Sequence, residues 1–205
     1  MNDSLNKVTE LLRELPGIGP RQARRLSFWL MRKEAGWVNT FARSLLEARK
    51  GIHTCPMCTR LYEAGPHDTG TCRTCEDPSR DASMLLIVEK DVDLENIERT
   101  GTYRGLYFVL GGTTGPLDKQ PEQRIRIEHL MRRLREPREP IKEVIFALSA
   151  TTEGEDTSAY VREQIDRAYP QHSYTLSELG RGLSTGTELE YVDADTMRSA
   201  LERRA

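Results

Sequence analysis

The sequence lacks several features that define whole classes of protein. None of its apolar runs reaches the ~18 residues that a membrane-spanning helix needs, and no signal-peptide core is found near the N-terminus. The phosphate-binding pattern GxxxxGK[ST] is missing from all 205 residues, which argues against nucleotide hydrolysis by a P-loop. Internal repeats and low-complexity tracts are missing too. We therefore expect a folded, cytoplasmic protein of one to three modest domains, with no membrane contact.

A strong net charge is also lacking, because the total is only −2. That total conceals two segments of opposite sign. Residues 13–50 carry nine basic and three acidic side chains, whereas residues 76–100 carry eight acidic and three basic ones. Taken singly, these charges could be solvated helix faces. Together they favour a local nucleic-acid face in the N-terminal part.

Cysteine is scarce, and all four copies fall in one window. The pattern is Cys55-x2-Cys58 and Cys72-x2-Cys75, with thirteen residues between the pairs. Two such turns can direct four sulfurs to one point and complete a tetrahedral shell for one structural Zn²⁺ per chain. A shell closed by four cysteines leaves no position for a substrate, so this metal would not be catalytic. Disulfides are disfavoured in a reducing cytosol, and a redox motif would need a single CxxC beside a βαβ unit.

Little else in residues 53–78 could build a core, so we expect this segment to unfold without metal. His53 and His67 lie close by and are alternative ligands, although loop positions suit them better.

The most informative stretch is the run Leu15-Pro16-Gly17-Ile18-Gly19-Pro20, set between two amphipathic patterns. Gly17 and Gly19 permit a tight turn in which bare backbone N–H groups can approach an anion. The next helix is predicted to start at about Pro20, which points its positive dipole end at the same place. Arg21, Arg24 and Arg25 follow in its first two turns. Such a hairpin binds phosphates and contacts no base edges, which predicts DNA binding without sequence preference. The alternative is a Pro/Gly turn that happens to be basic.

Around this turn, apolar spacing predicts three helices. The first carries Leu5 to Leu15 with Asp3 or Ser4 as its cap, and the third carries Val38 to Ala48 and ends at Gly51. Trp29 and Trp37 are predicted to be core residues of this helical part, with base stacking by Trp37 as the alternative.

Beyond Asp81 the pattern changes to short apolar runs alternating with helical patterns. Strands are predicted at 84–88, 106–110, 144–148, 172–176 and 189–192, and helices at 93–99, 122–134, 155–168 and 195–203. Continuous apolar runs are typical of strands buried on both faces, so we expect a mostly parallel sheet covered on both sides.

Carboxylates follow the first of these strands. Glu89 comes at its end, where open α/β sheets place their ligands, and Asp91 and Asp93 follow. Glu89 and Asp93 are therefore the candidates for contacting Mg²⁺ or a partner. A two-metal site would need further acids on a neighbouring strand, but residues 148–152 contain none. Asp193 and Asp195 form a DxD pair that resembles a Walker B element, although Asp195 could equally cap the final helix.

Taken together, these pieces resemble one family, the bacterial recombination mediator RecR. The resemblance is carried by LPGIGPRQARRLSFWL, by CPMC with CRTC, and by DPSRD after the last cysteine. It continues in IVEKDVDLENIERTGTYRGLYFVLGG, GPLD, ATTEGEDTSAYV and GRGLSTGTELEYVDADT. The match covers nearly the whole chain, and the long central block and the final segment are its most specific parts.

The resemblance implies an α+β chain of four parts: a helix-hairpin-helix at 1–52, a four-cysteine zinc module at 53–78, a Toprim domain with a mostly parallel sheet at 79–176, and a C-terminal Walker B-like strand-helix segment at 177–205. It also implies a non-catalytic homo-oligomer, a tetrameric ring that can encircle DNA and that helps RecO or RecF to load RecA. The family's DNA contacts fall on Arg21 and Arg25, and its Toprim glutamate falls on Glu89, with Asp93 nearby.

This chain departs from the family pattern in three places. The interval between the cysteine pairs is longer, Thr59 stands where glycine is usual, and Lys90-Asp91-Val92 replaces a proline-containing sequence. A longer loop costs little closure entropy, so metal binding should survive. Two other hypotheses stay open: an active Mg²⁺-dependent Toprim nuclease or nucleotidyl transferase, and a zinc-ribbon adaptor that binds only protein.

Overall fold

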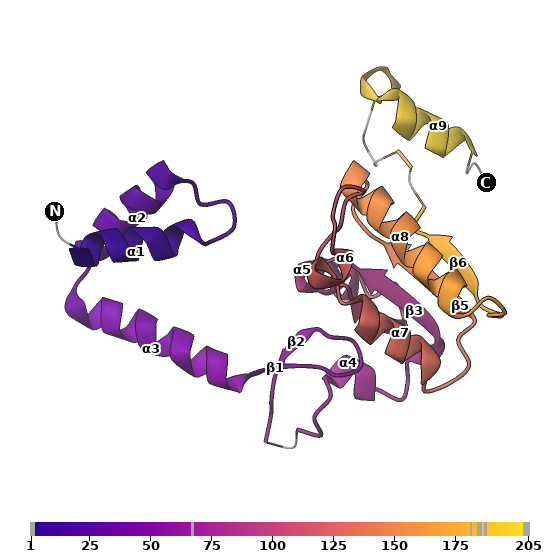
Figure 1. Ribbon diagram of the computed structural model, residues 1–205, viewed down its shortest axis with the longest axis horizontal. Helices are drawn as coiled ribbons and strands as arrows, with labels where there is room; N and C mark the ends of the chain where they lie inside the picture. Colours follow the sequence, from indigo (N-terminus) through magenta and orange to yellow (C-terminus); the bar gives the residue numbers. More distant parts are fainter. Residues whose placement is uncertain (1–2, 67, 181, 184–185, 187, 203–205) are drawn as a thin grey trace. The chain divides into compact units, whose positions relative to one another are not determined.

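The structure, a computed structural model, describes residues 3–66, 68–180, 182–183, 186 and 188–202 (Figure 1). The chain divides into two compact units, Met1–Ile52 and His53–Ala205. Among the described residues, no helix is both long enough and apolar enough to cross a membrane.

In its described residues the first unit forms α1 (Asp3–Arg13), α2 (Pro20–Met31) and α3 (Ala35–Gly51). The predicted start of α2 at Pro20 and the predicted end of α3 at Gly51 are both confirmed. Helices α1 and α2 pack through small side chains, because Ala23 and Ser27 are fully buried. The Ser27 hydroxyl lies 2.8 Å from that of Thr9, which ties the two helices together.

The prediction that Trp29 and Trp37 are core residues is wrong for this unit. Their exposed fractions are 47% and 40%, and their rings meet edge to face with centroids 5.4 Å apart. Phe41 stacks on Trp37, and the Lys33 ammonium lies 4.4 Å from the centre of the Trp29 ring. The reason is geometric: α3 extends away from the α1–α2 pair, so the described residues of this unit cover these rings only in part (Figure 1).

The second unit begins with a cysteine module, which we define as residues 53–78. Its regular elements are β1 (Ile52–Thr54), β2 (Leu61–Glu63) and the short helix α4 (Arg73–Glu76). Strands β1 and β2 form a two-stranded sheet. Its buried cluster consists of three of the cysteines, and Met57 and Tyr62 pack against them. This cluster is too small to stabilise the module by apolar burial alone.

A four-stranded sheet forms the body of the second unit. Its strands are β3 (Asp81–Val88), β4 (Gly105–Val109), β5 (Glu143–Ala147) and β6 (Thr175–Glu178). The order is β4-β3-β5-β6, and every neighbouring pair is parallel, as the continuous apolar runs predict. Because β3 is central, the chain turns to one side for β4 and to the other for β5. The carboxyl ends of β3 and β5 therefore meet at the switch point, where open sheets bind ligands.

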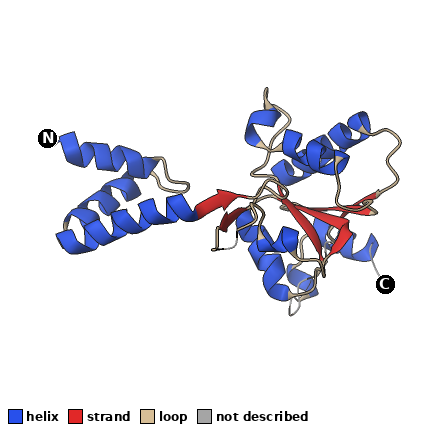
Figure 2. Ribbon diagram, turned by 90° about the horizontal axis from the view of Figure 1, so that it is seen from below, coloured by secondary structure: helices blue, strands red, loops and turns tan. Residues whose placement is uncertain are grey.

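Helices cover both faces of this sheet (Figure 2). Helix α5 (Asp91–Thr100) packs on one face through Leu94 and Ile97. Helices α7 (Ile127–Arg135) and α8 (Thr152–Ala168) cover the other face through Leu130, Val161 and Ile165. The result is a three-layer α/β/α domain whose core lies on both sides of β3.

Several predicted elements differ from the structure in their bounds or type. Strand β3 and helix α8 each begin three residues before their predicted starts at 84 and 155. The helix predicted at 122–134 is two helices, α6 (Pro121–Arg124) and α7, because Ile125 is extended and the Arg126 N–H donates to the Leu110 carbonyl. The strand predicted at 172–176 starts three residues later, since the His172 N–H closes a turn onto Tyr169.

The strand predicted at 189–192 is instead a 3₁₀ turn, η1 (Leu189–Tyr191). Leu189 and Tyr191 are 63% and 77% exposed, so the alternating pattern meets no neighbouring strand among the described residues that could pair with it. The closing helix α9 is present at Ala194–Glu202. The structure supports Asp193 as its cap, because the Asp193 carboxylate accepts hydrogen bonds from the Thr196 N–H and hydroxyl.

Candidate nucleic-acid interface and candidate metal centre

The turn between α1 and α2 is accessible within its own unit. Gly17 adopts a left-handed backbone with φ of +75°, which an L side chain rarely adopts. Gly19 is extended and immediately precedes α2, whose first residue is Pro20. No atom outside the chain neighbours lies within 4 Å of where a Cβ would stand at either glycine. The turn therefore presents open backbone at the N-terminal end of a 12-residue helix.

Two of the three predicted arginines lie beside this turn. Arg21 and Arg25 line a shallow hollow of about 510 Å³ together with Gly19. Arg24 is exposed but directed elsewhere, because its guanidinium carbon lies 5.9 Å from the centre of the Phe28 ring. Within the described part of the chain, Arg21 and Arg25 form no ion pair, so their charges are available to a polyanion.

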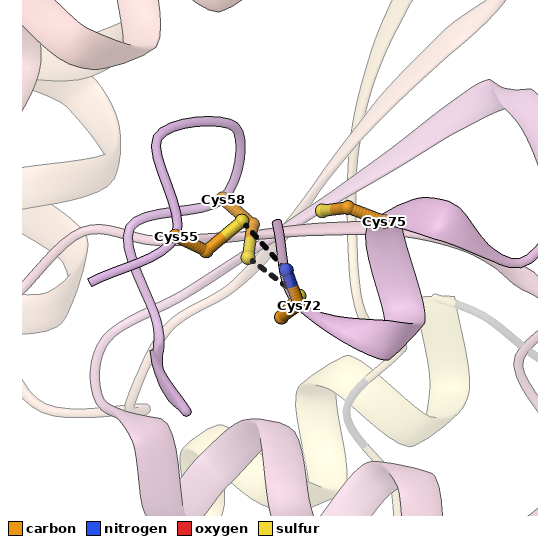
Figure 3. Close-up of side chains that lie close together, drawn as sticks. All are labelled: Cys55, Cys58, Cys72 and Cys75. Carbon is orange, nitrogen blue, oxygen red and sulfur yellow. Dashed lines mark hydrogen bonds between the residues drawn. The ribbon is translucent and has the colours of Figure 1, made fainter. Parts of the chain in front are cut away.

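The four cysteines meet at one point, as their spacing predicts (Figure 3). Cys55, Cys58 and Cys72 are at most 1% exposed, and Cys75 projects toward them from α4. The four sulfur atoms all lie within 4.8 Å of one another. A compact set of four thiol donors fits a tetrahedral metal ion such as zinc. His53 is exposed, and His67 lies outside the described residues.

The electrostatics of the cluster favour a cation at its centre. Because Cys58 and the other two thiols donate hydrogen bonds to its sulfur, the pKa of Cys55 lies far below the ordinary value of 9.0. The same bond raises the pKa of Cys58 far above that value. One thiolate thus opposes the ionisation of its neighbour. A bound cation is what would allow all four sulfurs to ionise together.

The cysteine module covers the free edge of β4. The Val109 N–H donates to the Cys58 carbonyl at 2.8 Å, and the Thr59 hydroxyl donates back to the Val109 carbonyl. Arg126 donates to both the Thr59 and Val109 carbonyls. Thr59 is 1% exposed and left-handed with φ of +60°, a conformation that is costly for a β-branched residue. The module is therefore fastened to the sheet by backbone and side-chain bonds.

The acids after β3 are already engaged by protein groups. Glu89 is 7% exposed; one carboxylate oxygen accepts from the Ser149 hydroxyl at 2.9 Å and the other lies 2.6 Å from the Lys90 ammonium. Asp93 accepts from the Lys90 N–H, which caps α5. Asp91 accepts from the Leu61 N–H of the cysteine module.

Glu89, Asp93 and Ser149 share a cavity of about 260 Å³. The structure thus brings the two predicted residues together. Ser149, which follows β5, supplies a hydroxyl at the position where a magnesium site would need a carboxylate. Among the described residues, the cysteines are the one group of three or more metal-ligating side chains that lie close together.

Comparisons with known proteins agree with this arrangement. Residues 5–49 match the family described as RecR, helix-hairpin-helix, and residues 83–173 match the Toprim domain family. Proteins named Recombination protein RecR from Enterococcus faecalis and from Lactococcus lactis subsp. cremoris are each 36% identical over 202 residues, covering 98% of this chain and 96% of theirs. The chain belongs to the RecR family. The predicted fold class is thereby confirmed, with its helix-hairpin-helix, four-cysteine cluster, parallel-sheet Toprim domain and C-terminal strand and helix.

Sequence reasoning does not find the residues that join the cysteine module to the Toprim domain of this RecR-family chain. In the sequence, Thr59 stands out only as a departure from glycine, and Asp91 only as one of several acids. The sequence does hold one signal for Thr59: it is a β-branched residue at a position where the family usually has glycine, which marks the position as unusual. No local signal marks the bond from Leu61 to Asp91, because thirty residues separate them.

Proposed function

We propose that this chain is a non-catalytic recombination mediator that holds DNA through its first unit without sequence preference. One observation carries the proposal: the open Gly17–Gly19 turn stands beside Arg21 and Arg25, whose charges are not used inside the described protein. Backbone N–H groups and a helix N-terminus suit one phosphate, and the two guanidinium groups suit its neighbours. These contacts involve no base edge.

The test is a salt titration of DNA affinity. Replacing Arg21 and Arg25 by alanine should weaken binding equally for unrelated sequences and lower the salt slope by roughly 0.7 to 0.9 for each phosphate that the variant no longer neutralises. The matched control is Arg43→Ala with Arg49→Ala, which removes the same charge from exposed positions on α3. Equal slopes for the two double variants would refute the role of the hairpin and would favour the protein-only adaptor.

For the metal centre, we propose one structural Zn²⁺ per chain, held by Cys55, Cys58, Cys72 and Cys75. The compact thiol set and the scarcity of apolar burial in the module support this proposal. Zinc would supply folding free energy to the module and no chemistry to a substrate, because four protein ligands close its shell. Elemental analysis of the purified chain tests the proposal, and a zinc content near one per chain is expected.

We propose that the Toprim domain scaffolds and does not catalyse. Glu89 is held by Ser149 and Lys90, and Asp93 caps a helix, so the carboxylates that would have to hold Mg²⁺ already serve the fold. Their remaining role would be contact with a protein partner, RecO or RecF, during loading of RecA. The alternative enzyme predicts Mg²⁺-dependent cleavage or synthesis that disappears in Glu89→Ala. Detection of such an activity would overturn this proposal.

We further propose that the chain acts as a tetrameric ring. The unit formed by α1, α2 and α3 leaves a set of large apolar side chains uncovered, which favours burial against another copy. The exposed aromatic and apolar residues of α2 and α3 are Phe28, Trp29, Met31, Trp37, Phe41, Leu45 and Leu46, and Leu11 and Leu15 are also exposed in the same unit. Several hairpins on one ring would also gain affinity by effective concentration. Mass measurement in solution, with and without DNA, tests this assembly, and a single-chain mass at micromolar concentration would refute it.

A further inference from the structure

A buried arginine stands beside the cysteine module without a carboxylate partner. Arg133 lies on α7, in the helical layer of the Toprim domain, and is 7% exposed. In the part of the chain that the structure describes, it forms no ion pair. Arginine keeps its charge when buried, and a buried charge without a counter-charge is strongly unfavourable. Its charge is therefore available to an anion nearby.

The contacts of Arg133 point to the cysteines. Its Nη1 lies 3.9 Å from the Sδ of Met57, which stands between Cys55 and Cys58 in the first cysteine turn. Met57 in turn packs against the buried sulfur cluster. The aliphatic stem of Arg133 thus belongs to the α7 layer, while its guanidinium faces the cysteine module.

Two further arginines approach the second cysteine turn. Arg60 donates to the hydroxyl of Thr74, which lies between Cys72 and Cys75 in the sequence, and its Nε is buried without a hydrogen-bond partner among the described atoms. Arg138 donates to the Cys75 carbonyl at 3.4 Å. Neither forms an ion pair with a described carboxylate. One guanidinium group within the module, that of Arg60, and two from outside it, those of Arg133 and Arg138, therefore lie beside the two cysteine turns.

We propose that Arg133, assisted by Arg60, is the counter-charge of a tetrathiolate metal centre. This inference rests on the proposed zinc site, where four thiolates and one Zn²⁺ together carry two negative charges. A cation close to that dianion stabilises the metal-bound form over the empty, protonated form. Arg133 is thus a positioning residue of the centre: it binds no metal itself, and it couples α7 to the occupancy of the cysteine module.

The experiment is competition for Zn²⁺ between the full chain and a chromophoric chelator. Arg133→Met keeps an unbranched apolar stem and removes the charged guanidinium, and we expect zinc affinity to fall by about 10- to 100-fold. Arg133→Lys restores the charge and should recover most of that loss. Arg132→Met is the matched control, because Arg132 is the exposed neighbour of Arg133 on the same helix. This variant should bind zinc as tightly as the unchanged chain does.

The outcomes separate this inference from the zinc proposal. If the unchanged chain binds no Zn²⁺, the proposed metal centre fails. If the unchanged chain binds Zn²⁺ and Arg133→Met binds it equally tightly, the counter-charge inference fails. Loss of affinity in both the Met and the Lys variants would show that packing matters and charge does not, which also overturns the inference. Should Arg133→Met not fold with excess zinc, as judged by circular dichroism, Arg60→Met must show the weakened affinity instead.

Discussion

The contact between Thr59 and the edge of β4 can be tested with a substitution that changes one atom. Thr59→Val keeps the branched shape and the left-handed backbone but removes the hydroxyl, whose one proton lies between the Cys58 and Val109 carbonyls. If the module is held on the sheet by the bond to the Val109 carbonyl, it should detach more often in the variant, while the sheet itself stays folded.

The free-energy cost of Thr59→Val follows from the hydrogen-bond partners that the Val109 carbonyl keeps in the variant. Thr59 is 1% exposed, so water cannot replace its hydroxyl in the closed state. The Val109 carbonyl keeps the Arg126 Nη1 at 3.3 Å, which prevents a fully unsatisfied acceptor. Loss of one buried hydrogen bond with partial compensation costs about 1 to 2 kcal/mol. That cost corresponds to a roughly 5- to 30-fold larger population of the detached state.

Amide hydrogen exchange on the zinc-loaded chain is the suitable assay. The Val109 N–H donates to the Cys58 carbonyl, so it exchanges when the module detaches. The Leu110 N–H donates to Val88 inside the sheet and reports on opening of the sheet itself. We expect exchange at Val109 to accelerate by the same roughly 5- to 30-fold and exchange at Leu110 to remain unchanged.

Two controls complete the design. Thr59→Ser keeps the hydroxyl and should leave exchange at Val109 close to that of the unchanged chain. Thr69→Val removes an exposed hydroxyl from the same module and should have little effect. Unchanged exchange at Val109 in Thr59→Val would refute the reasoning, and equal acceleration at Val109 and Leu110 would show global unfolding in place of detachment.

Three other predictions address metal, packing and pH. Chelation should open the segment between the two cysteine pairs to protease, because its apolar cluster is small; identical digests with and without chelator would contradict this. Gly154→Ala should lower the free energy of unfolding in urea by about 1–3 kcal/mol, since its Cβ would overlap the Ser149 carbonyl oxygen; an unchanged midpoint would argue against the close approach. Hydrogen bonds from the Ser83 hydroxyl and N–H lower the pKa of Asp81 below its ordinary 3.8. Ionised Asp81 therefore stabilises the fold above about pH 3.8, and this stabilisation is lost as the pH falls through the lower folded pKa. Asp81→Asn should remove this part of the acid dependence of unfolding, and an unaltered profile would contradict it.

Much of the candidate site is predictable because it depends on short stretches of chain. The hairpin turn follows from Gly17 and Gly19, and the start of α2 follows from Pro20. The cysteine cluster follows from two CxxC turns, which each place two sulfurs on one side of the chain. The central strand at 84–88 is equally local, since a continuous apolar run has few alternatives to burial.

Predictions failed where an outcome depended on a distant neighbour. The apolar pattern of α2 and α3 predicts that Trp29 and Trp37 are buried. It does not show that the residues of their own unit bury the two rings only in part. The alternating run at 189–192 is suitable for a strand, but a strand also needs a partner. The break between α6 and α7 depends on a bond from Arg126 to the end of β4.

The turns, the metal-ligand spacing, the charge asymmetry and the family are predictable from the amino-acid sequence, because each of these is encoded within a few dozen residues or in whole-chain similarity. Which groups meet is seen only in three dimensions: Thr59 lies on the edge of β4, Asp91 on the cysteine module, and Arg133 beside Met57. Such meetings depend on how helices and strands pack, and packing combines residues that the linear order keeps far apart.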